Sequence, residues 1–236
     1  MNSDIHEPLY AEKPPLGIVD RVEYLCEKST GMDILHVGCA DYPLTTERMN
    51  SEDFLHRRLT KASRSCLGVD LSTEAIEVMK SAGMDNVAWA DACALSDQFG
   101  ADFDVIVAGE VVEHLPNPGM FMEQAAQCLR PGGKLLVTVP NAFNIMRLWG
   151  LVRGREIVHR DHCYYFSSKT LARLASLAGF GVSEIAYTDP LATARHRPGL
   201  TPLYRTAIKR YPAFGQSVVA SFSVGSESEK PHRIIA

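Results

Sequence analysis

The segment FDVIVAGEVVEHLPNP, residues 103–118, is the most informative of the chain, because an apolar run typical of a buried strand ends directly in polar and acidic residues. Continuous apolar strands of this kind are typical of parallel sheets that are covered on both faces. Glu110, Glu113 and His114 stand at positions i, i+3 and i+4, a spacing that gathers two carboxylates and an imidazole on one side of a helical turn. The stretch therefore predicts either a ligand site at the end of a strand or a salt-bridged first turn of a helix.

The same pattern of short apolar strands recurs on both sides of this stretch. Further strands are predicted at residues 33–37, 65–70, 86–91, 134–140, 181–188 and 216–224. Amphipathic helices are predicted at residues 16–29, 73–83, 119–133 and 167–180, the second of them capped by Ser72. Strands that alternate with helices predict an α/β fold with a doubly wound, seven-stranded and mostly parallel sheet.

A length of 236 residues favours a single domain, which we place at residues 1–225. Two stretches, 141–166 and 189–214, interrupt the alternation of strands and helices, and we expect them to build a small cap over a substrate. The polar segment 226–236 is expected to be a flexible tail.

Charge is distributed unevenly along the chain. Residues 1–146 contain 11 Lys and Arg against 22 Asp and Glu, whereas residues 147–210 contain 11 against 4. The second region therefore either meets an anionic partner or forms a solvated basic face.

The chain contains no apolar run of membrane-spanning length and no signal peptide at its start. Its six cysteines lack a paired CxxC spacing, so that neither a disulfide framework nor a zinc site is favoured. These features predict a cytoplasmic protein with reduced thiols and without a transmembrane segment.

Acidic residues end two consecutive predicted strands. Asp70 could accept hydrogen bonds from two ribose hydroxyls, and Asp91 could accept one from an adenine amine. The loop after the first strand, VGCADYPL, has one glycine, Gly38, and lacks the G-x-G-x-x-G pattern that cradles a diphosphate. The sequence therefore predicts an adenosine-bearing cofactor without phosphates.

In this order the segments resemble the class I methyltransferases that use S-adenosyl-L-methionine, over roughly residues 33–180. LHVGCADYP is similar to their glycine-rich first motif, GVDLS to their ribose-binding acid, WADACAL to their adenine loop, and LRPGGKLLVTVPN to their fifth strand. The resemblance implies a Rossmann-like methyltransferase fold and cofactor binding by Gly38, Cys39, Ala40, Asp70, Leu71, Asp91, Ala92 and Glu110. His36 stands where the family has an acid, and Ala40 and Tyr42 stand where it has glycines.

The segment EVVEHL resembles two metal-using groups, the O-methyltransferases of ubiquinone biosynthesis and the methyltransferases of the terminal ribose 2′-hydroxyl of small RNAs. The resemblance implies that Glu110, Glu113 and His114 bind a divalent metal ion together with His162, which follows Pro140 and Asn141 as in the RNA enzymes. Such a ligand set suits manganese, iron, cobalt or zinc better than magnesium. Glu113, His114 and His162 are the candidate catalytic residues, and without an ion either histidine could act as general base.

The residues around His162 limit the classes of substrate that we expect. Tyr164, Tyr165 and Phe166 follow it where the RNA enzymes have a Phe-Glu-Trp type run, which disfavours nucleic acid. The pattern DH…FS…TL…L…AGF, within residues 161–180, resembles bacterial methyltransferases of small molecules and surface glycans. Nearby arginines suit an anionic substrate. We therefore expect O-methylation of a hydroxyl on a small molecule or glycan precursor. RNA ribose methylation and cofactor binding without catalysis are the alternatives.

Overall fold

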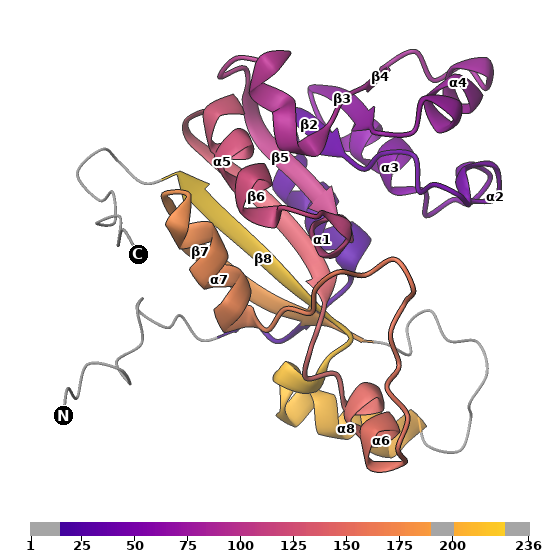
Figure 1. Ribbon diagram of the computed structural model, residues 1–236, viewed down its shortest axis with the longest axis vertical. Helices are drawn as coiled ribbons and strands as arrows, with labels where there is room; N and C mark the ends of the chain where they lie inside the picture. Colours follow the sequence, from indigo (N-terminus) through magenta and orange to yellow (C-terminus); the bar gives the residue numbers. More distant parts are fainter. Residues whose placement is uncertain (1–14, 190–200, 225–236) are drawn as a thin grey trace.

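The computed structural model describes residues 15–189 and 201–224, and for residues 201–205 the backbone alone. Its strands are β1 (Ile18–Val19), β2 (Asp33–Val37), β3 (Ser65–Asp70), β4 (Val87–Trp89), β5 (Phe103–Gly109), β6 (Leu129–Pro140), β7 (Phe180–Thr188) and β8 (Ser217–Val224). They form one sheet in the order β1-β7-β8-β6-β5-β2-β3-β4 (Figure 1). Neighbouring strands are parallel except that β8 runs antiparallel to β6 and β7. The predicted doubly wound α/β sheet is confirmed.

Helices pack on both faces of this sheet, and others lie beyond its end (Figure 1). They are α1 (Arg21–Ser29), α2 (Thr45–Met49), α3 (Leu55–Ala62), α4 (Thr73–Ser81), α5 (Pro118–Cys128), α6 (Ile145–Val152), α7 (Ser168–Leu177) and α8 (Thr201–Arg210), with 3-10 turns η2 (Ala92–Asp97), η3 (Val112–His114) and η4 (Pro212–Phe214). Within the described residues, no helix is both long enough and apolar enough to cross a membrane.

Successive residues of the central strands point to opposite faces, which separates two cores. Leu35 and Ile106 join the core beneath α5 and α7, whereas Ile34 and Val105 join the core beneath α1 and α3. Fully burying aliphatic side chains of this size stabilises the fold by about 1.5–3 kcal/mol each. The sheet is therefore a rigid platform, and its carboxyl edge is where loops can carry chemistry.

The start of the chain differs from the prediction. Residues 16–19, which we predicted as the first turn of a helix, pair with β7: the Leu16 amide donates to the Ile185 carbonyl (2.8 Å), and the Tyr187 amide donates to the Gly17 carbonyl (2.9 Å). Asp20 then caps α1 by accepting from the Glu23 amide (3.0 Å). The described sheet thus has eight strands and not the seven predicted, because β1 adds an edge strand.

The helix predicted at 119–133 is shorter than expected. It ends at Cys128, and the Pro-Gly-Gly segment that we took as its end lies inside β6. Leu129 pairs with Phe103, and the register then shifts before Lys134 pairs with Val105. The glycines turn the strand, with Gly132 at a φ of +78°.

The predicted cap insertions contain helices. Residues 141–166 were expected to be irregular, but Asn144 caps α6 by accepting from the amides of Met146 (2.8 Å) and Arg147 (3.2 Å). The second insertion contains α8, which lies with α6 beyond the end of the sheet where β6 stops (Figure 1). Residues 190–200 of that insertion and the predicted tail 226–236 lie outside the described residues.

Candidate functional site

The loop after β2 turns tightly against the neighbouring strands. Gly38 has a φ of +73°, and a Cβ at this position would clash with Cγ2 of Val111. The amides of Gly38 and Cys39 both donate to the Val69 carbonyl, at 2.8 and 3.1 Å. A glycine is therefore required at this position, both by the backbone conformation and by the close approach of Val111.

Asp70, at the end of β3, connects this loop to α4. Its Oδ2 accepts from the Ala40 amide (3.1 Å), and its Oδ1 accepts from the Ser72 amide (3.0 Å). Each carboxylate oxygen keeps a further lone pair for a ligand. Outside glycine, the described residues with positive φ are Asp41 and Glu110, so Ala40 replaces the glycine of the family pattern without left-handed backbone strain.

The remaining predicted cofactor residues lie along the same edge. Asp91 follows β4, and its Oδ1 accepts from the Cys93 amide (2.8 Å), which begins η2. Leu71 is 63% exposed, while Ala92 is buried. The Trp89 indole donates to the Leu71 carbonyl (2.9 Å) and fixes the two strand ends relative to each other. The ends of β3 and β4 thus offer two carboxylates and an exposed apolar side chain.

Glu113 is the most unusual residue of the site. It is fully buried in η3, and neither carboxylate oxygen has a hydrogen-bond partner among the described residues. Burial, and secondarily the charge of Glu110, raise the pKa of Glu113 to about 9. Glu110 has a φ of +59°, and its own Oε1 is buried without a partner in the described part of the chain. A buried carboxyl group left without partners indicates a site that takes a ligand.

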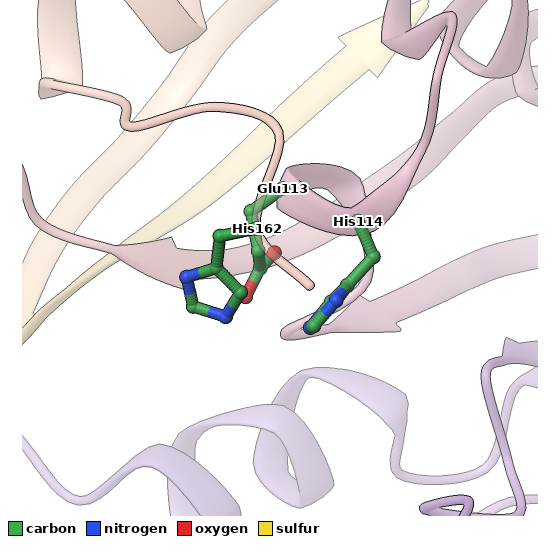
Figure 2. A group of neighbouring side chains, drawn as sticks. All are labelled: Glu113, His114 and His162. Atoms are coloured by element: carbon green, nitrogen blue, oxygen red, sulfur yellow. The ribbon is translucent and has the colours of Figure 1, made fainter. Parts of the chain in front are cut away.

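Two histidines lie on either side of this carboxylate. Ligand atoms of Glu113, His114 and His162 all lie within 4.8 Å of one another. Figure 2 shows that Glu113 and His114 come from the turn after β5, whereas His162 comes from the loop that crosses it. The two imidazole rings meet edge to face, with centroids 4.6 Å apart. The structure therefore brings together three of the four predicted metal ligands, and Glu110 is a second carboxylate that acts on Glu113 through its charge.

Backbone contacts hold the two segments together. The Cys163 amide donates to the Glu113 carbonyl (2.8 Å), and His114 Nδ1 lies 3.1 Å from the Asp161 carbonyl. A carbonyl can only accept, so Nδ1 of His114 carries the proton and Nε2 is left free as a ligand or base. Burial, and then the charges of neighbouring histidines, lower the pKa of His162 to about 4, so that this imidazole is neutral at pH 7.

These residues fit a divalent cation. Among the described residues, both Glu113 oxygens, Glu110 Oε1 and His162 Nδ1 are buried without a hydrogen-bond partner. His114 has the hydrogen bond to a backbone carbonyl that metal-bound histidines usually make. Mixed nitrogen and oxygen ligands suit manganese, iron, cobalt or zinc.

Arg21 was missed by the sequence reasoning. It is the first residue of α1, and its Nη1 would lie 3.3 Å from a Cβ at Gly109, so the guanidinium covers the end of β5. Its charge opposes the raised pKa of Glu113 and contributes to lowering the pKa of His36. An arginine at the start of a helix carries no local signal of such a role, because only the packing of α1 on the sheet brings it to this edge.

A second histidine pair lies beneath the loop after β2. His36 and His56 stack with ring centroids 5.5 Å apart, and their Nδ1 atoms are 3.3 Å apart. Both are buried, and burial is the main cause that lowers both pKa values, that of His56 to about 4. The histidine that replaces the usual acid of the first motif thus packs inward, against His56.

Known proteins are similar in sequence to this chain. A family model described as a methyltransferase domain matches residues 10–185. A ubiquinone biosynthesis O-methyltransferase from Rattus norvegicus is 30% identical over 136 residues, which are 54% of this chain and 36% of that protein. The enzyme of the same name from Nitrosospira multiformis is 24% identical over 191 residues, 76% of this chain and 74% of that protein. This chain therefore matches only about a third of the length of the rat relative.

The fold is shared with solved structures. A SAM-dependent methyltransferase from Archaeoglobus fulgidus has a TM-score of 0.57 at 17% identity, covering 86% of this chain and 94% of that chain. At this identity the likeness shows the fold alone.

Proposed function

We propose that this chain methylates a hydroxyl oxygen of a small molecule or glycan precursor. The chain belongs to the methyltransferase domain family and is a class I S-adenosylmethionine-dependent methyltransferase. The observation that carries the oxygen acceptor is the buried Glu113 carboxylate between two imidazoles at the end of β5. The names of the Rattus norvegicus and Nitrosospira multiformis relatives, both O-methyltransferases, support it.

The cofactor would bind along the ends of β2, β3 and β4. Gly38, Cys39 and Ala40 would allow the close approach of its methionine part, and Asp70 would accept from the ribose hydroxyls with its remaining lone pairs. Leu71 and Ala92 would contact the adenine, and Asp91 would accept from its amine. Arg21, whose Nη1 lies at the end of β5, would receive the methionine carboxylate. When bound, S-adenosylmethionine supplies an electrophilic sulfonium methyl group.

The acceptor hydroxyl would lie beside Glu113, His114 and His162. A divalent ion held by these residues, with Glu110 beside them, would lower the pKa of the hydroxyl by acting as a Lewis acid. Without the ion, His114 Nε2 takes the proton, because Nδ1 is held by the Asp161 carbonyl. The loop that carries His162 covers Glu113 and excludes water from it.

The test separates cofactor binding from chemistry with two substitutions. Calorimetric titration with S-adenosylhomocysteine should show binding weakened at least tenfold in Asp70→Ala but unchanged in Glu113→Gln. Methyl transfer to vicinal diols and catechols should be lost in Glu113→Gln. Glu123→Gln, an exposed acid on α5, is the matched control and should keep full activity. Full activity in Glu113→Gln would reject the proposed catalytic site.

Metal assistance is tested on the same samples. Manganese should bind the metal-stripped protein with a stoichiometry near one per chain, and this binding should be lost in Glu113→Gln. Cofactor binding without manganese binding would reject metal assistance and favour the form of the reaction in which His114 acts as general base.

A further inference from the structure

Arg147 is a half-buried cation that forms no ion pair with a carboxylate of the residues that the structure describes. Arg58, Arg64 and Arg130 each pair with an aspartate or glutamate, but within the described residues no ion pair involves Arg147. Arg153, on the same cap, is exposed, so water solvates its charge. A partly desolvated and unpaired guanidinium is costly unless an anion meets it.

Neighbouring groups hold Arg147 in place. Its guanidinium lies 4.4 Å from the centroid of the Tyr165 ring, and Nη1 donates to the Asn141 carbonyl (3.3 Å). Asn141 is itself fixed by two hydrogen bonds to the Ala213 and Gly215 carbonyls, both 2.8 Å. The Tyr165 hydroxyl donates to the Ile157 carbonyl (2.9 Å). The arginine is therefore preorganised, and little rotamer entropy remains to be lost when a ligand binds.

Through Tyr165 the fixed guanidinium is linked to His162, one of the three residues drawn in Figure 2. The Tyr165 ring, on which it stacks, meets the His162 ring edge to face with centroids 6.1 Å apart. The positive charge of Arg147 acts on both Glu113 and His162, lowering the pKa of each relative to burial alone. The cap thus places an unpaired cation beside the predicted position of the acceptor hydroxyl.

We infer that the methyl acceptor carries a compact oxyanion, a carboxylate or a phosphate, which Arg147 binds while the hydroxyl lies at Glu113, His114 and His162. The inference rests on the proposed function, because it names the substrate class of that site. A planar guanidinium donates two parallel hydrogen bonds to either oxyanion, and the anion neutralises the unpaired charge. Arg147 is then the residue that selects anionic acceptors.

Two matched pairs of probes test the assignment: 3,4-dihydroxybenzoate against 3,4-dihydroxybenzamide, and glucose 6-phosphate against glucose. Each is titrated calorimetrically into the full-length protein saturated with S-adenosylhomocysteine, with and without manganese. In at least one pair the anionic probe should bind about tenfold tighter than its neutral counterpart. Arg147→Met should remove this preference, Arg147→Lys should keep part of it, and Arg153→Met should leave it unchanged. The pair that shows the preference distinguishes carboxylate from phosphate.

The inference is overturned if neither anionic probe gains over its neutral counterpart, including the case in which no probe binds, or if Arg147→Met keeps the preference. Thermal unfolding of each variant shows that the fold is intact. Methyl transfer, followed separately with S-adenosylmethionine, distinguishes the two proposals. A binding preference that depends on Arg147, without methyl transfer to oxygen, would reject the O-methyltransferase and leave the anion site standing.

Discussion

Neighbouring imidazoles occur at two places in the described part of the chain: His36 beside His56, and His114 beside His162 with His159 next to both. The surroundings of His36 and His56 differ sharply from those of His114 and His162. His36 and His56 stack at an interplanar angle of 16° and are 2% and 1% exposed. His114 and His162 meet at 86°, with His114 exposed and His162 half-buried. Histidine side chains therefore pack in the interior in one place and line an accessible site in the other.

The difference lies in what accompanies each pair. The buried pair is surrounded by apolar groups and by the thiols of Cys39 and Cys66, and both imidazoles are kept neutral by burial. The accessible pair has beside it the carboxyl group of Glu113, which lacks a hydrogen-bond partner within the described residues. An unsatisfied acid, and not the presence of histidine, distinguishes a site from a core.

Removing the accessible pair should have the largest effect. The double substitution His114→Ala and His162→Ala should lower methyl transfer to the best acceptor among the vicinal diols and catechols about a thousandfold. It removes the proposed general base and two of the proposed metal ligands. The free energy of unfolding should change by less than about 1 kcal/mol, because His114 is exposed and His162 is only half-buried. His56→Leu, assayed at pH 8, should keep most of the activity, and an equal loss in both variants would erase the distinction between the pairs.

The buried pair should instead control stability against acid. The folded-state pKa of His56 is lowered to about 4 against an unfolded value of 6.5, so the unfolded chain binds more protons between these values. The free energy of unfolding should therefore fall by about 3 kcal/mol as the pH drops from about 6.5 to about 4. Urea unfolding at several pH values measures this fall, and His56→Leu should flatten it.

The raised pKa of Glu113 changes the free energy of unfolding with pH in the direction opposite to that of His56. Its folded state holds a proton that the unfolded state releases between about 4.5 and about 9, so this contribution to stability is lost as the pH rises through that window. Comparing wild type with His56→Leu cancels it. An unchanged slope in the variant would show that His56 is not the group responsible.

The close packing around the buried pair gives the smallest of the three effects. A Cβ at Gly68, on β3, would lie 2.6 Å from Cε1 of His56 and 2.9 Å from Sγ of Cys39. Gly68→Ala should therefore cost about 1–3 kcal/mol in the free energy of unfolding. Gly181→Ala, at a strand glycine with no atom within 4 Å of its Cβ, is the control and should change stability by less than about 0.5 kcal/mol. Equal costs at the two glycines would argue against tight packing.

The sheet could be predicted because its strands are encoded locally. The apolar runs at 33–37, 65–70 and 103–109 match β2, β3 and β5, and Ser72 caps α4 as expected, accepting from the Ala75 amide at 3.2 Å. The two-residue β1 could not be predicted, because its pairing with β7 depends on a contact across more than 160 residues of chain. The end of α5 was misplaced because Pro-Gly-Gly is typical of a helix end but equally of a bulged strand.

The candidate site was predictable in its residue types but not in its geometry. Glu113, His114 and His162 were all named from the sequence, and the structure places them together. The positive φ of Glu110 and the burial of Glu113 depend on the packing of β6, which local spacing does not encode. Arg21 and His56 have no signal of their own, since only the fold brings them to this edge.

The hydrogen bond between the Cys163 amide and the Glu113 carbonyl has a consequence for redesign. Segment 141–166 carries a proposed specificity residue, Arg147, and would be the natural piece to exchange between related enzymes. Because His162 is positioned by the main chain of the turn after β5, a transplanted cap brings a working histidine only if that turn, 110–114, is transplanted with it. The two segments must therefore be exchanged together, although 26 intervening residues of helix and strand separate them in the chain.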